Sequence, residues 1–128
     1  MLSRITPAAI HPPAANYSHA TGVPPTARWL YLSGQVGVAP DGTIPDDAGT
    51  QAEICFANIG AILREAGMDP ADLVRLTTYL IDVRDRAGYM AVRDRFVGSP
   101  PPASTLLVIS ALADPRYRIE VEAVAARV

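Results

Sequence analysis

The chain has 128 residues, of which 49% are hydrophobic and 19% are charged, so it can bury a core and is expected to form one domain over residues 1–128. Its formal net charge of −2 is too small to direct it to nucleic acid or to an anionic membrane. All 11 basic residues are arginine, and the lack of lysine excludes a Schiff-base enzyme, a lysine-anchored pyridoxal phosphate site and a Walker-type nucleotide site.

Cysteine and histidine are too scarce for a zinc site, since the chain has only Cys55, His11 and His19. We therefore predict no metal and no cofactor. A single cysteine forms no intrachain disulfide, which suits a reducing compartment, and its place in an apolar helical pattern favours a buried structural thiol. No apolar run approaches the ~20 residues of a membrane span, and no signal-peptide pattern opens the chain. We expect a cytoplasmic protein without a membrane partner.

The first part of the chain is predicted to be extended and then to enter a long strand. Residues 1–25 are rich in proline and alanine, with an edge strand expected from Asn16 to Thr21. Residues 28–38 (RWLYLSGQVGV) favour a strand, in which Gly34 permits a bulge or a close approach of the backbone to another group. Asp41-Gly42 marks the turn that follows.

An amphipathic helix is predicted next, ending at Ala66 with Gly67 as its stop signal. Thr50 and Glu53 have the spacing of a capping box, although a start nearer Asp46 is the alternative. Apolar residues recur at intervals of three and four along this segment: Ala52, Cys55, Phe56, Ile59, Ile62, Leu63 and Ala66.

The second half of the chain alternates strand and helix. Strands are expected over residues 73–81, 104–110 and 117–125, and a helix over residues 84–97, which the prolines at 100–102 end. Tyr89, Val92 and Phe96 form the inner stripe of that helix. In the last strand, apolar residues alternate with polar ones, which predicts one buried face: Ile119, Val121, Ala123 and Ala125.

The element order predicts an α+β protein with a mixed β-sheet and two helices on one of its faces. Residues 106–109 (LLVI) are apolar on both sides of their strand, so the face without helices needs a cover. A second copy of the chain is the economical cover, and we expect an oligomer.

Six short segments, which run in order over nearly the whole chain, carry a family resemblance: Tyr17-Ser18, Ser33-Gly34-Gln35, residues 51–67, residues 74–80 (VRLTTYL), Pro102-Ala103 and residues 119–123 (IEVEA). Together they resemble the RidA/YjgF family of enamine and imine deaminases, whose members are also labelled endoribonuclease L-PSP. The resemblance implies a chorismate-mutase-like fold and a homotrimer. It also implies small-molecule clefts between neighbouring subunits.

In deaminases of this family, an arginine follows the Pro-Ala pair and binds the substrate carboxylate with its planar fork. Here Pro102-Ala103 is followed by Ser104 and Thr105. A hydroxyl supplies no positive charge, and the loss of a bidentate pair costs on the order of 3 kcal/mol, or roughly a hundredfold in affinity. We expect Ser104 and Thr105 to contact an uncharged or more apolar ligand.

Glu120 matches the family glutamate that orients the water attacking the imine carbon, a role that suits a carboxylate because it can accept the proton. The strand pattern alone offers a simpler interpretation, in which Glu120 and Glu122 are two outward, solvated charges. Arg118 either pairs with Glu120 or is itself an ordinary solvated arginine.

The resemblance also places Tyr17, Ser33 and Gly34 at the cleft. Simpler roles exist for two of them, since Tyr17 can pack the N-terminal arm onto the sheet and Gly34 can merely form a bulge. Three positions around the cleft depart from the family, which indicates a different ligand: Asn16 for proline, His19 for glutamine and Met90 for asparagine.

Three functions follow as hypotheses. The first is a deaminase-like hydrolase of C=N bonds with altered specificity and no covalent intermediate. The second is a non-catalytic binding or regulatory trimer with the same cleft. The third, an endoribonuclease or translation inhibitor, is disfavoured, so no nucleic-acid partner is expected. The arginines of the second helix alternate with aspartates, which predicts a salt-bridged surface: Arg84, Arg86, Arg93 and Arg95 with Asp82, Asp85 and Asp94.

Overall fold

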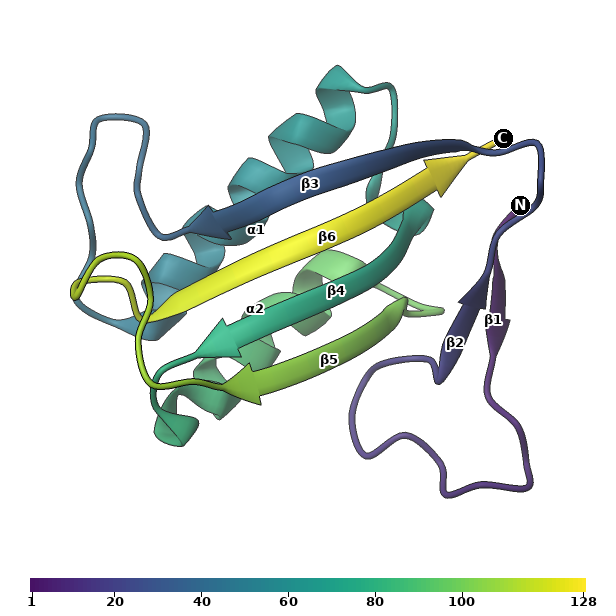
Figure 1. Cartoon of the computed structure of the whole chain (residues 1–128), viewed down its shortest axis with the longest axis horizontal. Coiled ribbons are helices and arrows are strands. Elements are labelled where there is room, and N and C mark those ends of the chain that lie inside the picture. Colours follow the sequence, from purple (N-terminus) through teal and green to yellow (C-terminus); the bar gives the residue numbers. More distant parts are fainter.

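The computed structural model describes residues 1–128 and has a four-stranded sheet at its centre (Figure 1). The strands lie in the order β3 (Arg28–Val36), β6 (Ile119–Arg127), β4 (Leu73–Leu80) and β5 (Ala103–Val108). Strand β6 is antiparallel to both of its neighbours, whereas β5 runs parallel to β4, so the sheet is mixed. Two further strands, β1 (Ser3–Ile5) and β2 (Ala20–Gly22), form a separate antiparallel pair beside it.

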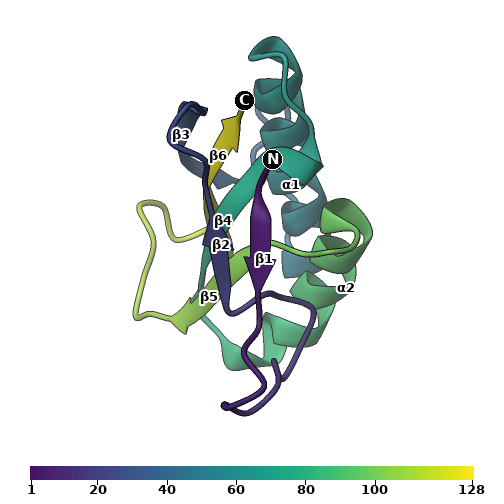
Figure 2. The same cartoon turned by 90° about the vertical axis from the view of Figure 1, so that its right-hand side faces the viewer.

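Both helices, α1 (Ala48–Glu65) and α2 (Arg86–Val97), cover the same face of the sheet (Figure 2). Short 3-10 turns, Pro70–Asp72 and Val83–Asp85, lead into β4 and α2. The core lies between the helices and the sheet, and it buries the alternating apolar residues predicted in the last strand. The predicted α+β class with two helices on one face is therefore confirmed. Neither helix has the length and apolar character that crossing a membrane requires.

The start of α1 corrects one prediction. Asp47 caps the helix, because its side chain accepts a hydrogen bond from the Thr50 backbone N–H at 2.7 Å. Thr50 therefore lies inside the first turn, the Thr50/Glu53 capping box is wrong, and the alternative start near Asp46 is correct. An aspartate is as good a cap as a threonine, and Asp47 is the one that precedes the first buried residue of the helix, Ala48. The predicted end is confirmed, since Gly67 adopts a φ of 71°.

The N-terminal arm lies along the start of β5, which decides where Tyr17 sits. The Ser18 backbone N–H donates to the Pro102 carbonyl at 3.0 Å, and the Ser18 hydroxyl donates to the Pro101 carbonyl at 2.7 Å. Prolines have carbonyls but no N–H, so this segment accepts hydrogen bonds that the arm supplies. The strand expected over residues 16–21 forms instead at 20–22, because these residues pair with β1.

The face of the sheet without helices exposes aromatic and apolar side chains. Trp29 is 46% exposed and Tyr31 is 76% exposed, and their rings stack with centroids 6.1 Å apart. Leu107 of β5 is 45% exposed. We call this surface the open face. It is the surface that the predicted self-association would bury.

Candidate functional site

Three of the predicted ligand-binding residues, Tyr17, Met90 and Ser104, line one pocket of about 250 Å³. We call it the α2 pocket. Ser104 lies on the helix-covered side of β5, because its partner across the ladder to β4 is the buried Leu76. The walls come from the N-terminal arm, α2 and β5: Ala14, Ala15, Tyr17, Arg86, Met90, Arg93, Ser104 and Leu106.

Tyr17 contacts other residues of the N-terminal arm and also lines the α2 pocket. Its hydroxyl accepts a long hydrogen bond from the Ala14 N–H at 3.4 Å, and its ring meets the ring of His19 edge-on at 5.8 Å. These contacts hold the arm in shape. The same residue also contributes to the wall of the α2 pocket.

Arg86 and Arg93 also line the α2 pocket, and sequence reasoning missed them. It assigned both to a solvated, salt-bridged helix surface. That assignment is correct for Arg84, which pairs with Asp82 at 2.6 Å, and for Arg95, which reaches Glu53 at 3.5 Å. For Arg93 the predicted ion pair is present, with Asp94 at 2.9 Å, but the surface position is wrong, since only 4% of Arg93 is exposed.

The helical spacing carried a signal for these two arginines. Arg86, Met90 and Arg93 are separated by four and then three residues, so they lie on one side of α2. With Met90 placed at the cleft, the same period would have placed Arg86 and Arg93 beside it.

A second group of predicted residues lies where β3 is irregular. The register between β3 and β6 shifts between Leu32 and Gln35, so Ser33 and Gly34 form a bulge. A Cβ atom at Gly34 would overlap the Glu120 carboxylate, only 2.7 Å from its Cδ. Both predicted roles of Gly34, a bulge and a close approach, are present together. We call Ser33, Gly34 and Glu120 the bulge site.

The Glu120 carboxylate has no hydrogen bond or ion pair within the chain, although the residue is half-buried. Glu122, two residues further along β6, differs because its carboxylate accepts a hydrogen bond from the Tyr79 hydroxyl at 2.7 Å. Arg118 pairs with Asp85 at 2.9 Å, so both predictions for Arg118 are wrong. The reason is that Arg118 precedes β6, and its backbone N–H is held by the Gln51 side chain at 2.9 Å.

Cys55 packs behind the bulge. Its thiol donates to the Gln35 carbonyl at 3.2 Å, and burial, with the negative charge of Glu120 as a smaller cause, raises the pKa of the thiol to about 12. The predicted buried structural cysteine is confirmed. A thiol that stays protonated at neutral pH is a poor nucleophile, so its place is in the packing of the bulge.

Thr105 does not reach the α2 pocket. It follows Ser104 on a strand, so its side chain points to the open face, where its hydroxyl accepts a hydrogen bond from Arg75 Nη2 at 2.7 Å. The sequence placed Ser104 and Thr105 in one site, and the structure does not bring them together.

Within one chain, the α2 pocket and the bulge site lie on opposite faces of the sheet. Ser104 pairs with Leu76, on the covered face, whereas Glu120 pairs with Tyr79, whose side chain lies on the open face. A single chain therefore does not place Ser104 opposite Glu120.

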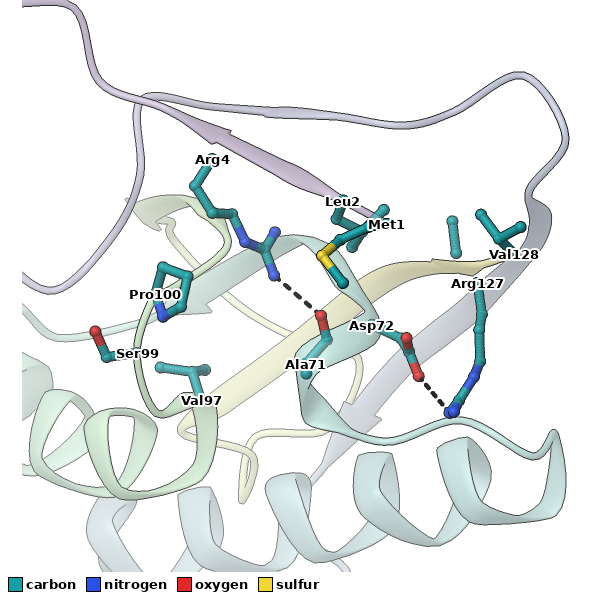
Figure 3. A pocket seen from close by; sticks show the side chains of 11 residues that line it. Met1, Leu2, Arg4, Ala71, Asp72, Val97, Ser99, Pro100, Arg127 and Val128 are labelled. Carbon is teal, nitrogen blue, oxygen red and sulfur yellow. Dashed lines mark hydrogen bonds and ion pairs between the residues drawn. The ribbon is translucent and has the colours of Figure 1, made fainter.

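A larger hollow, of about 430 Å³, lies at the other end of the sheet between β1 and the chain termini (Figure 3). It contains none of the predicted residues. Its two guanidinium groups are already bound, Arg4 to the carbonyls of Ala71 and Leu73 and Arg127 to Asp72 at 3.1 Å. Its walls are mainly apolar, and it has no catalytic group comparable to Glu120. No cluster of three or more His, Cys, Asp or Glu side chains suited to a metal ion is present.

Comparison with known proteins gives a consistent result. The sequence model of the family described as Endoribonuclease L-PSP matches residues 7–127. The 2-iminobutanoate/2-iminopropanoate deaminase of Bos taurus is 35% identical over 121 residues, which cover 93% of this chain and 82% of that protein. Protein DfrA of Myxococcus xanthus is 34% identical over 85% of this chain and 83% of its own length.

Solved structures agree in fold. The Rid family protein YyfB from Yersinia pestis superposes with a TM-score of 0.89 and is 32% identical, with 98% of each chain covered. RidA from an Antarctic Psychrobacter has a TM-score of 0.73 and is 30% identical over 88% of this chain and 89% of that one. The family match over nearly the whole sequence, together with this shared fold, shows that the chain belongs to the Endoribonuclease L-PSP family, that is, the RidA/YjgF family.

Proposed function

We propose that the protein is a hydrolytic deaminase of imine-type small molecules. Relatives such as the Bos taurus protein are named as imine deaminases, which supports this general activity. The observation that carries the proposal is the Glu120 carboxylate, which is half-buried against Gly34 and has no partner in the chain. A carboxylate that is not neutralised by its own protein can accept a proton from water.

The reaction adds water across the C=N bond. A water oxygen bonds to the imine carbon, the π electrons move to nitrogen, and Glu120 takes the proton that the water loses. Glu120 then returns this proton to the nitrogen, which gives a carbinolamine. The proton of the carbinolamine hydroxyl next passes to the nitrogen through Glu120, the C–N bond breaks, and ammonia leaves as the C=O bond forms. An imine and one water thus give a carbonyl compound and ammonia. No covalent intermediate is needed, and the absence of lysine excludes a Schiff base with the enzyme.

The active site is proposed to be shared between two copies of the chain. One copy would supply the α2 pocket, and its neighbour would supply the bulge site with Glu120. The exposed ring pair of Trp29 and Tyr31 gives the open face an apolar contact surface for assembly. A homotrimer is the assembly that the family resemblance implies.

Specificity is proposed to differ from that of the family's carboxylate-binding deaminases. Ser104 stands where those enzymes have an arginine, and the pocket around it includes the apolar side chains of Met90 and Leu106. The β5 side of this pocket therefore has no cation for a substrate carboxylate.

The direct test is ammonia release from freshly generated imines, both carboxylated and neutral, in the presence of the purified protein. Glu120→Gln is expected to lower the rate by roughly 10²- to 10⁴-fold, because it removes the proton acceptor. Glu122→Gln is the matched control on the same strand and the same face, and it is expected to keep most of the activity. An unchanged rate for Glu120→Gln would show that Glu120 is not the base. Ligand-induced thermal stabilisation of the wild type without any ammonia release would instead support the non-catalytic binding function.

The shared site is tested by mixing two inactive proteins. Glu120→Gln removes the base, and Ser104→Trp fills the α2 pocket. After the two are unfolded and refolded together, about a quarter of the sites should combine an intact Glu120 with an intact α2 pocket, because each half is drawn at random from the two variants. Recovered activity supports the shared site. If mixed assemblies form and no activity returns, Glu120 and the α2 pocket do not act together in one shared site.

A further inference from the structure

The α2 pocket has a charge that the sequence did not predict. Two of its eight lining residues are arginines, and none is acidic. The other polar groups of its wall are the hydroxyls of Tyr17 and Ser104, which can donate hydrogen bonds. Every polar side chain of the wall is therefore a hydrogen-bond donor or a cation.

Arg86 is the free cation of this pocket. It is the first residue of α2, and its side chain has no hydrogen bond or ion pair within the chain, whereas Arg84 is held by Asp82 and Arg95 by Glu53. Nothing in the protein therefore competes with a ligand for the guanidinium group of Arg86.

Arg93 is nearly buried, and one of its edges is unused. Its Nε and Nη2 donate to Asp94 Oδ1 at 3.1 and 2.9 Å, and its guanidinium lies 5.8 Å from the centre of the Tyr89 ring. Its Nη1 has no partner among the hydrogen bonds of the chain, and since no fully buried side-chain polar atom lacks a partner, this atom keeps some exposure. Arg93 lines the α2 pocket, so Nη1 is a donor that an acceptor entering the pocket can use.

We propose that Arg86 and Arg93 are specificity-determining residues, which bind the carboxylate of a small organic acid in the α2 pocket. The planar fork of a guanidinium matches the two oxygens of a carboxylate, and Tyr17 and Ser104 add neutral donors. Met90 and Leu106 contact the apolar remainder of the ligand. This inference rests on the proposed function, because it assigns the anionic end of the substrate to the half-site that lacks Glu120.

The inference reverses one expectation from the sequence. The serine at position 104 indicated an uncharged ligand, because β5 carries no cation. In the structure the cations approach the same pocket from α2. The arginines of α2 bind the carboxylate, so the carboxylate lies elsewhere in the pocket than in an enzyme whose arginine lies on β5. The preferred shape of the acid therefore differs as well.

The test measures binding to the intact protein by titration calorimetry, with three probes. The first is 2-oxobutanoate, the stable product expected from 2-iminobutanoate. The second is its neutral analogue 2-oxobutanamide, and the third is inorganic phosphate. We expect 2-oxobutanoate to bind at least about tenfold more tightly than the amide, because only the acid makes charge-assisted hydrogen bonds. Tighter binding of phosphate than of 2-oxobutanoate would overturn the assignment to a carboxylate.

Arg86→Gln is the principal variant, because this exposed side chain has no hydrogen bond or ion pair within the chain whose loss could unfold it. It is expected to weaken 2-oxobutanoate binding by about tenfold and to leave 2-oxobutanamide unchanged. Arg95→Gln is the matched control, an arginine of the same helix that lies outside the pocket, and it is expected to have no effect. Equal binding of 2-oxobutanoate by wild type and Arg86→Gln would overturn the inference. Arg93→Lys, which keeps the charge but loses the fork, should give an intermediate loss.

The same proteins separate this inference from the proposed function. If 2-oxobutanoate binds and Arg86→Gln weakens it while no imine releases ammonia, the anion site stands and the deaminase proposal is wrong. If ammonia is released from carboxylated imines with the same KM by wild type and Arg86→Gln, the deaminase proposal stands and the anion site is wrong.

Discussion

The two halves of the candidate site are built in different ways. The bulge site is fixed by the backbone, because the carboxylate of Glu120 occupies the space that a side chain at position 34 would need, and Cys55 packs behind it. The α2 pocket is made of side chains from three segments that lie far apart in the sequence. The first half therefore tolerates almost no change, whereas the second can change its ligand through single substitutions. This difference suits a catalytic group in one half and a specificity pocket in the other.

Among the substitutions that compare the bulge site with the α2 pocket, Gly34→Ala is expected to have the largest effect. The new methyl group overlaps the Glu120 carboxylate, so the carboxylate or β3 must move, and misplacing a catalytic group by about 1 Å costs roughly a hundredfold in rate. The overlap is also expected to lower the free energy of unfolding by about 1–3 kcal/mol. The rate of ammonia release and urea unfolding measure these two quantities.

Gly88→Ala is the control for this substitution. Gly88 lies in α2, and a Cβ atom there meets nothing within 4 Å, so the variant should be as stable as the wild type or slightly more stable. A Gly34→Ala protein with normal activity and stability would mean that Glu120 can turn away at no cost, and the bulge site would then not be rigid.

Ser104→Arg in the Arg86→Gln background tests how readily the α2 pocket can change the way it binds its ligand. The double variant moves one cation from α2 to the facing wall on β5, so it should recover most of the roughly tenfold affinity for 2-oxobutanoate that Arg86→Gln loses. In the wild-type background the same Ser104→Arg change adds a third arginine to a pocket that already has two, and a smaller gain is expected. No recovery in the double variant would show that the geometry of the pocket, rather than its charge, selects the ligand.

The reactivity of the Cys55 thiol tests the packing behind the bulge, and it is the smallest of the effects expected here. Its raised pKa, about 12, means that the native thiol remains protonated at pH 8, and it should react with a thiol-specific reagent many times more slowly than the unfolded chain. The folded state holds this proton more tightly than the unfolded one, whose cysteine has its ordinary pKa near 9.0. This contribution to stability is thus complete below pH 9 and is lost as the pH rises towards 12. Rapid labelling of the native protein at pH 8 would contradict the buried position.

Much of the fold could be predicted from the sequence, because short-range periodicity records which side of an element is buried. The alternation along β6 and the spacing of three and four in α1 identified the buried positions, and Gly67 marked the helix end. The error at the start of α1 arose because Asp47 and Thr50 are both good caps and only three residues apart. Local chemistry alone did not choose between them.

For the candidate site, the sequence by itself determined which residue types are present: a glutamate on the last strand, a glycine in the bulge, a serine after Pro102-Ala103, and no lysine. Only the tertiary structure decided which of them meet. Arg84, Arg86, Arg93 and Arg95 look alike in the sequence. Because α2, β5 and the N-terminal arm enclose one pocket, Arg86 and Arg93 line it, whereas Arg84, in the turn before α2, and Arg95 lie outside it and pair with Asp82 and Glu53. A periodic pattern gives the side of an element on which a residue lies, whereas what faces that side is set by contacts between segments far apart along the chain.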